Sequence, residues 1–209
     1  MKQLPHLEEE IKLWNQNKIV AGVDEVGRGC LAGPVVAAAV ILPMHYKPIF
    51  QVNDSKRLNN KQREFIYKQI INSDIKYSVS FIDNHIIDDI NILQATFLAM
   101  TIATNNLKEK PNFLLIDGNR YNNNTIPYKT IIKGDTISFS IAAASVIAKV
   151  ERDKYLINSI HKEFPNYYFD KNKGYGTKKH FTSLKTYGAT RYHRQTFLKK
   201  FNLKLINLF

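Results

Sequence analysis

Short runs of apolar residues divide this chain into a predictable series of strands. The runs at Ile19–Val23 and Val35–Leu42 are uniformly apolar, which is typical of strands buried on both faces. The connection between them contains three glycines and a proline, which permit a tight turn and a close approach of the backbone to a ligand. Three further strands are predicted at Tyr77–Ile82, Phe113–Asp117 and Thr130–Lys133.

Amphipathic and alanine-rich segments lie between and after these runs, and they predict helices. The last of them is rich in alanine at its start, which allows close packing on a sheet. The order of elements is an α/β pattern with a mixed sheet. The predicted helices are Lys61–Ile71, Ile92–Asn106 and Ser140–Ile160, followed by a polar loop at Asn166–Thr177 and a remainder that is helical with a basic face.

Composition limits the class of protein. The 209 residues, 44% of them hydrophobic, are enough for one domain with a real core. The single cysteine, Cys30, cannot form an internal disulfide. Acidic residues stand near the N-terminus where a signal peptide would be basic and apolar, and the apolar run Leu31–Met44 is too short and too broken to span a bilayer. We therefore expect a cytoplasmic protein with no membrane association.

The net charge of +12 is concentrated in one part of the chain. Residues 1–148 carry a balance of +2, whereas residues 149–209 carry +10 and hold 12 of the 24 aromatic residues. Cations interleaved with aromatic rings suit a polyanion whose sugars or bases can stack, which favours nucleic acid as the partner. A solvated helical surface with ordinary core aromatics explains the charge alone equally well.

Carboxylates end two of the predicted strands and follow a third. Asp24 and Glu25 end the first strand, Asp117 ends the fourth, and Asp135 follows the fifth. Strand ends at one edge of a sheet can converge, and clustered acids need a cation to offset their repulsion. Oxygen ligands select Mg²⁺ or Mn²⁺, and two such ions can assist phosphodiester hydrolysis.

Taken singly, each of these acids is more simply interpreted as a turn former or a helix cap. The combination of strand-end acids with a basic, aromatic segment is what favours a nuclease. Other residues suggest less: the six histidines lack the spacing of zinc ligands, and Gly27-Arg28-Gly29 is too short for a phosphate-binding loop of the P-loop type. Cys30 is best interpreted as a small core residue.

A set of motifs, in order along the chain, resembles the signature of bacterial ribonuclease HII. The resemblance extends from about Val20 to Phe197, nearly the whole chain. Its motifs are Gly22-Val23-Asp24-Glu25-Val26-Gly27-Arg28-Gly29, Asn53-Asp54-Ser55-Lys56, Asn91-Ile92-Leu93-Gln94-Ala95-Thr96, Ile116-Asp117-Gly118-Asn119, Lys133-Gly134-Asp135, Ala142-Ala143-Ala144-Ser145-Val146-Ile147-Ala148-Lys149-Val150 with Arg152-Asp153, and Gly174-Tyr175-Gly176-Thr177 with His180.

The resemblance implies a ribonuclease H-like fold in residues 1–160, with a basic helical extension for substrate binding in residues 161–209. It also implies endonucleolytic cleavage of the RNA strand of RNA–DNA hybrids and cleavage 5′ of single ribonucleotides in duplex DNA, leaving 5′-phosphate and 3′-hydroxyl ends. The implied ligands of Mg²⁺ or Mn²⁺, two ions in the catalytic complex, are Asp24, Glu25, Asp117 and Asp135, with Asp153 as the alternative fourth acid.

The family also implies how ribose is sensed. Gly27, Arg28 and Gly29 would present backbone groups to the 2′-hydroxyl and the adjoining phosphate, and Tyr175 would stack on the deoxyribose that follows. Lys56 and Lys149 would contact phosphates, with His180 and Arg194 as further candidates. The segment 189–194 departs from the proline-containing stretch common in relatives, which leaves the path of the last helix open.

Two alternatives remain at this point. A ribonuclease HIII-type enzyme would share the core but would carry an additional N-terminal substrate-binding domain, and only 18 residues precede Ile19. A non-catalytic nucleic-acid-binding module would account for the basic segment but not for the acids. No feature predicts an oligomer, so we expect a monomer.

Overall fold

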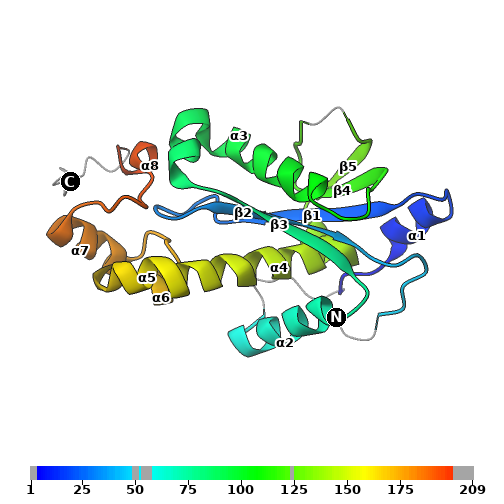
Figure 1. Ribbon diagram of the computed structural model, residues 1–209, viewed down its shortest axis with the longest axis horizontal. Helices are drawn as coiled ribbons and strands as arrows, with labels where there is room; N and C mark the ends of the chain where they lie inside the picture. Colours follow the sequence, from blue (N-terminus) through cyan, green and yellow to red (C-terminus); the bar gives the residue numbers. More distant parts are fainter. Residues whose placement is uncertain (1–3, 49–51, 53–57, 123–124, 200–209) are drawn as a thin grey trace.

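A five-stranded mixed sheet forms the centre of the computed structural model, which describes residues 4–48, 52, 58–122 and 125–199. The strand order is β3-β2-β1-β4-β5. β1 pairs antiparallel with β2 and parallel with β4, so the expected mixed α/β sheet is confirmed (Figure 1). The strands are β1 Val20–Val26, β2 Val35–Ile41, β3 Lys76–Ile82, β4 Phe113–Asp117 and β5 Tyr128–Ile131.

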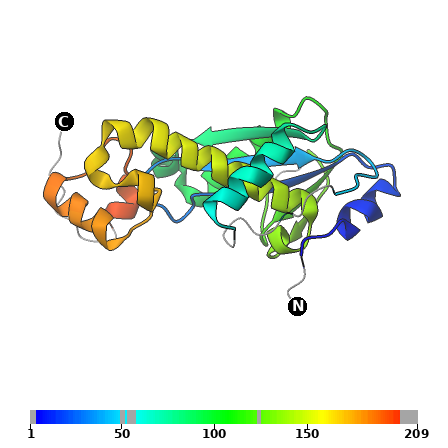
Figure 2. The same ribbon diagram turned by 90° about the horizontal axis from the view of Figure 1, so that it is seen from below.

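Helices cover both faces of this sheet, as the uniformly apolar strands predict (Figures 1 and 2). Successive side chains of a strand point to opposite faces, so β2 sends Val36, Ala38 and Val40 into one core and Val35 and Ala37 into the other. The first core lies under α2 (Asn60–Ile71) and α4 (Phe139–Tyr155), and the second lies under α3 (Asn84–Asn105).

Close packing of α4 on β1 explains the small residues in both elements. The alanines near the start of α4 are fully buried, and Ser138 caps the helix by accepting a hydrogen bond from the backbone N–H of Ile141. A Cβ at Gly22 of β1 would lie 2.3 Å from the backbone carbonyl carbon of Ser140. Only glycine therefore lets the strand and the helix approach this closely.

α3 consists of two helices joined at Asn91, whose φ of 66° and ψ of 162° are not helical. The second helix was expected, whereas the first, which begins after the N-cap Asp83, was not. Asn91 itself caps the second helix by accepting hydrogen bonds from the N–H groups of Leu93 and Gln94. α3 is long and apolar enough to cross a membrane, but its buried apolar residues pack on the sheet.

Three expectations about element bounds were wrong. Asp24 and Glu25 lie inside β1, because the ladder with β2 continues to Val26. The fifth strand lies earlier than predicted, because Lys133 adopts a left-handed conformation and begins the short 3-10 turn Gly134–Thr136. The expected loop at 166–177 contains a one-turn helix, α6 Phe169–Asn172.

The C-terminal elements gather at one end of the molecule, opposite α1 (Glu8–Trp14) (Figure 1). α4 continues without a break through a π-helical turn to Glu163, and the later helices pack against the loop after β1 in a third apolar cluster that includes Leu31 and Leu156. The remaining elements are the π-helical turn Leu156–Ile160, α5 His161–Glu163, the 3-10 turn Pro165–Tyr167, α7 Lys178–Tyr187 and α8 Gln195–Lys199.

Replacing Gly22 by alanine should destabilise the protein by about 2 to 3 kcal/mol, because the methyl group would overlap backbone atoms that cannot move freely. Gly29→Ala is the matched control, since nothing lies within 4 Å of a Cβ at Gly29. Urea unfolding of the two variants checks this, and equal midpoints for both would contradict the close contact.

Candidate active site

Acidic side chains from two neighbouring parallel strands lie at one edge of the sheet. Val23 of β1 is in register with Ile116 of β4, so Asp24 and Asp117 follow at the next position on adjacent strands. Asp24 is 3% exposed, and Asp117 is half-buried. The parallel pairing therefore brings together two acids that lie far apart in the sequence.

The electrostatics of Asp24 identify the other members of the group. Burial raises the pKa of Asp24 well above its ordinary value, and the charges of Glu25, Asp117 and Asp135 raise it further, against a hydrogen bond with Ser145. Carboxylates interact in this way only when they lie close together in a poorly solvated place. The charges of the other three acids expected from the sequence therefore act on Asp24, and we call these four residues the acid cluster.

Asp135 reaches the acid cluster through a tight turn. Lys133, at φ 57°, starts the turn, and the backbone N–H of Gly134 donates a 2.6 Å hydrogen bond to Oδ1 of Asp117. A side chain at Gly134 would lie 2.7 Å from Ile141 and 3.3 Å from that same oxygen. The glycine before Asp135 therefore allows the turn to lie directly against β4.

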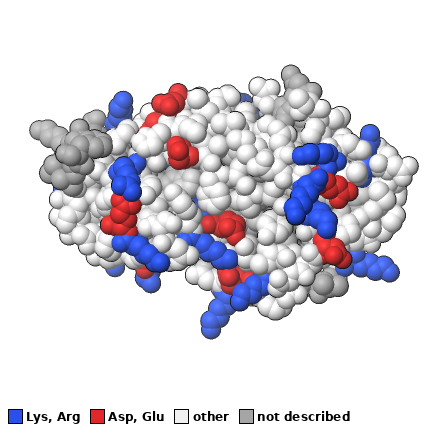
Figure 3. Space-filling model, viewed as in Figure 1, with Lys and Arg blue, Asp and Glu red and all other residues white. Residues whose placement is uncertain are grey.

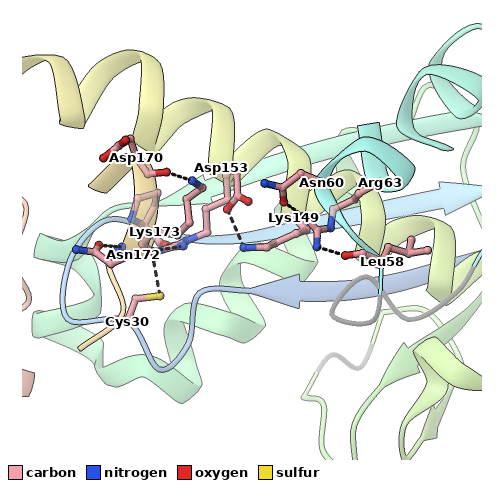
Figure 4. Close-up of polar contacts among 12 residues, drawn as sticks. Cys30, Leu58, Asn60, Arg63, Lys149, Asp153, Asp170, Asn172 and Lys173 are labelled. Atoms are coloured by element: carbon pink, nitrogen blue, oxygen red, sulfur yellow. Dashed lines mark hydrogen bonds and ion pairs between the residues drawn. The ribbon is translucent and has the colours of Figure 1, made fainter. Parts of the chain in front are cut away.

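Asp153, the alternative fourth acid, lies in different surroundings. Its Oδ1 accepts a 2.8 Å hydrogen bond from Nζ of Lys149, one turn earlier on α4. Figure 4 shows this pair beside Lys173 and close to Arg63 of α2. Asp153 is not among the charges that raise the pKa of Asp24, so it faces cations whereas Asp135 faces acids.

The acid cluster suits a hard divalent cation. All four members offer carboxylate oxygens, and a buried Asp24 surrounded by like charges gains from any positive charge that enters. Within the described residues, no three His, Cys, Asp or Glu side chains are arranged as a ready-made cage. Mg²⁺ is commonly held by one or two carboxylates with water and substrate phosphate as further ligands, so a cage is not required.

The segment Gly27-Arg28-Gly29 is held from beneath by buried Arg194. Its guanidinium donates to the carbonyl oxygens of Gly27 and Arg28, both at 2.8 Å, and to that of Gly33 at 2.9 Å. In a trans peptide the N–H points away from the C=O, so the N–H groups of Arg28 and Gly29 point away from Arg194. The exposed side of this segment, which we call the GRG loop, therefore presents backbone donors.

A second buried guanidinium, Arg152 of α4, supports the next part of the same loop. It donates to the carbonyl oxygens of Pro34 at 2.9 Å, Ala32 at 3.2 Å and Lys173 at 2.9 Å. A Cβ at Gly27, which has φ 92°, would lie 2.2 Å from the Arg152 side chain. This close contact explains why glycine is needed at position 27. The hydrogen bonds of Arg152 also join the loop after β1 to the segment before Tyr175.

Tyr175 lies beside this loop with its side chain 40% exposed. Leu31 N–H donates a 2.8 Å hydrogen bond to the carbonyl of Gly174, and a Cβ at Gly174 would lie 2.4 Å from the carbonyl oxygen of Ala32. Burial of the hydroxyl end, together with the nearby Cys30, raises the pKa of Tyr175 to about 12. The phenol is thus neutral and leaves part of its ring open for contact with a ligand.

A cavity of about 360 Å³ adjoins the acid cluster. It lies between the end of β4 and the second helix of α3, and the cationic side chains of Arg28 and Arg120 contribute to its wall. Arg28 also lies 3.4 Å from Glu25, so the GRG loop and the acids share this space. Its other lining residues are Leu93, Thr96, Phe97, Met100, Asp117, Gly118 and Asn119.

Two expected phosphate contacts were wrong. His180 is fully buried and hydrogen-bonded to His193, so its ring cannot reach a duplex. Arg194 is also fully buried, and burial lowers its pKa to about 10, which leaves it charged beneath the GRG loop. Lys149 is paired with Asp153, and Lys56 lies outside the described residues.

Sequence reasoning missed the roles of Arg152 and of Ser145. Arg152 belongs to the Arg152-Asp153 motif, in which only the acid was considered as a functional residue. The sequence pattern does not indicate that the arginine is buried. Ser145 lies in the alanine-rich part of α4 and bonds to Asp24. The only feature of the sequence that could have indicated its role is a hydroxyl group among small apolar residues.

Cations lie in small groups on one face of the molecule (Figure 3). On the face drawn in Figure 3, basic and acidic side chains alternate and leave large uncharged areas between them. Some of the C-terminal excess is used internally, since Arg152 and Arg194 are buried and Arg191 pairs with Glu163 at 2.8 Å. Exposed lysines remain on α7, at Lys178, Lys179 and Lys185.

Comparison with known proteins supports the interpretation of the motifs. A family model described as ribonuclease HII matches residues 21–202. Ribonuclease HII of Caldicellulosiruptor bescii is 49% identical over 93% of this chain and 94% of its own length, and that of Christiangramia forsetii is 50% identical over 90% and 94%.

A solved structure gives the same result for the fold. The crystal structure of ribonuclease H2 from Pyrococcus horikoshii superposes with a TM-score of 0.66 at 25% identity, covering 87% of this chain and 95% of that one. The sheet, its helical layers and the helical C-terminal region are therefore those of a ribonuclease H-like fold. From the motifs, the fold and the relatives together, this chain belongs to the ribonuclease HII family, endonucleases that hydrolyse RNA in RNA–DNA hybrids.

Proposed function

We propose that this enzyme is a metal-dependent endonuclease that also cuts duplex DNA 5′ of a single embedded ribonucleotide. The acid cluster is the observation that supports this most directly, because a bound cation would offset the repulsion among acids gathered around a buried carboxylate. Water would form the new bond to phosphorus as the bond to the preceding 3′ oxygen breaks. The products carry a 3′-hydroxyl and a 5′-phosphate.

Asp24, Glu25, Asp117 and Asp135 are the proposed metal ligands and catalytic residues. Mg²⁺ or Mn²⁺, two ions in the catalytic complex, would supply activation of water and neutralisation of charge on the leaving oxygen. Asp24 and Asp117 lie on adjacent strands, and Gly134 holds Asp135 next to Asp117. The ion pair of Asp153 with Lys149 favours a supporting role for that acid.

The GRG loop and Tyr175 would recognise the junction between ribose and deoxyribose. Backbone N–H groups of Arg28 and Gly29 point away from Arg194 and could meet the 2′-hydroxyl and its phosphate. The half-exposed ring of Tyr175 is suited to stacking on the sugar that follows. Lys149, which is paired with Asp153 in the absence of substrate, and Lys56 are the proposed phosphate contacts.

Removal of ribonucleotides and RNA primers is the role that this activity suits. We place the enzyme in the cytoplasm as a monomer, acting on RNA–DNA hybrids and on ribonucleotide-containing duplexes. A non-catalytic binding module would instead retain duplexes without cutting them and would be insensitive to EDTA.

Asp24→Asn and Asp117→Asn should each reduce cleavage by more than about 10²-fold in Mg²⁺ or Mn²⁺, since each removes a charge from the acid cluster. Gel assays on a duplex with one ribonucleotide measure this, with EDTA as a further arm. Duplex binding should survive in both variants.

Asp135→Asn should also reduce cleavage by more than about 10²-fold, whereas the matched variant Asp153→Asn should keep more activity. If Asp153→Asn loses more activity than Asp135→Asn in the same assay, Asp153 is the fourth metal ligand and Asp135 is not.

Tyr175→Ala should reduce cleavage at a single embedded ribonucleotide by about tenfold, because a stacking contact is worth about 1 to 3 kcal/mol. Cleavage of a uniform RNA–DNA hybrid should change less, since the following sugar there is a ribose. Comparing kcat/KM for the two substrates measures the effect. An unchanged ratio would remove Tyr175 from substrate recognition.

Lys178→Gln combined with Lys179→Gln should weaken duplex binding and reduce the slope of log K against log salt by about 1 to 2, since each phosphate contact contributes about 0.9. The control pair is Lys12→Gln with Lys108→Gln, two exposed lysines, one on α1 and one in the loop after α3. Fluorescence anisotropy between 50 and 200 mM salt provides the slopes. Identical slopes for both pairs would place the duplex elsewhere than on α7.

A further inference from the structure

Two histidines meet inside the C-terminal region, out of contact with solvent. His180 of α7 and His193, which precedes α8, are 0% and 1% exposed. Their Nε2 atoms lie 2.9 Å apart, and the rings of Tyr167 and Phe169 pack around them. A contact between two imidazole nitrogens requires that one donate and the other accept.

The partners of the two rings determine the direction of every hydrogen bond. The backbone N–H of Thr190 donates to Nδ1 of His193 at 2.9 Å, so this nitrogen carries no proton. A neutral His193 therefore has its proton on Nε2 and donates to Nε2 of His180. His180 must then carry its proton on Nδ1, and it donates to the carbonyl oxygen of Tyr175 at 2.9 Å.

Both rings are held neutral. Burial lowers the pKa of His193 to about 3, with the neighbouring His180 adding to the effect, and burial also lowers the pKa of His180. An additional proton on His180 would place hydrogens on both nitrogens of the 2.9 Å contact, and one on His193 would face the backbone N–H of Thr190. The chain from Thr190 through His193 and His180 to Tyr175 is therefore fixed in one direction, and we call it the histidine relay.

The relay ends on the residue proposed to contact substrate. The carbonyl of Tyr175 also accepts from the N–H of Thr177 at 2.8 Å, and the N–H of Tyr175 donates to the carbonyl of Asn172. These two bonds are local to the loop, whereas the bond from His180 ties the carbonyl to α7 and, through His193, to the segment before α8. Fixing this peptide fixes the direction in which the exposed ring leaves the backbone.

We propose that His180 and His193 are positioning residues that orient Tyr175 for its contact with the sugar after the ribonucleotide. The inference rests on the proposed function of Tyr175 and goes beyond it, because it assigns substrate preference to two groups that never touch substrate. A buried histidine that only fills space would leave the preference between substrates unchanged.

The test compares variants of His180 by the ratio of kcat/KM on a duplex with one ribonucleotide to that on a uniform RNA–DNA hybrid. His180→Leu removes the donor and should lower the ratio about tenfold, as far as Tyr175→Ala does. His180→Asn, whose amide can donate from nearly the position of Nδ1, should restore the ratio to within about twofold. His85→Leu, at an exposed histidine of α3, should leave it unchanged.

A double variant tests whether His180 acts through Tyr175. Adding His180→Leu to Tyr175→Ala should lower the ratio no further, because the relay acts only through that ring. A ratio that falls for Tyr175→Ala but not for His180→Leu would overturn the relay alone. If Tyr175→Ala leaves the ratio unchanged, the proposed role of Tyr175 fails, and the relay fails with it.

A measurement on the unsubstituted protein covers the case in which His180→Leu does not fold. Nitrogen-15 NMR of labelled histidines distinguishes the two neutral tautomers. We expect His180 protonated on Nδ1 and His193 protonated on Nε2 at pH 7. The opposite tautomers, or charged rings, would overturn the inference.

Discussion

Two buried guanidinium groups join α4 and the C-terminal segments to the loop after β1. Removing an arginine from water costs several kcal/mol unless its donors are satisfied. In the described part of the chain neither Arg152 nor Arg194 forms an ion pair. Each is satisfied instead by backbone carbonyls of the loop after β1. Because charged hydrogen bonds contribute about 1.5 to 3 kcal/mol each, the loop and the arginines stabilise one another.

This arrangement has a functional consequence. Carbonyls that point inward leave the opposite N–H groups pointing outward, so the same contacts that bury the arginines prepare a donor surface at the GRG loop. Arg152 also holds the carbonyl of Lys173, close to Tyr175. The two elements proposed to recognise ribose and the following sugar are therefore built against the same pair of charges, and neither can move without disturbing the other.

The acid cluster and the exposed cations have different electrostatic roles. Asp24 and its neighbours form a small negative site that a divalent ion would neutralise, whereas exposed lysines of the C-terminal region lie on α7 (Figure 1). On the face drawn in Figure 3, the cations of the described residues do not form one continuous positive area. Part of the net charge of +12 is structural, because two arginines are buried and others pair with acids.

The sequence by itself determined the strands, the main helices and the candidate acids. Apolar runs such as Val35–Leu42 must be buried on both faces, so local pattern is enough to place them. The motifs of the resemblance named the family, which the comparisons confirmed. Element bounds were less secure, because the ladder that carries Asp24 into β1 and the left-handed Lys133 depend on pairing and on local conformation.

Only the tertiary structure decided which residues act together. The resemblance favours Asp135 and keeps Asp153 as the alternative, and only packing puts the turn of Asp135 against Asp117 and Asp153 beside Lys149. Arg194 and His180 look like surface groups in a basic segment, yet both are buried where carbonyls and a second histidine satisfy them. Local sequence fixes periodicity, whereas the burial and partner of a polar side chain depend on segments distant in the chain, and pattern alone does not contain that information.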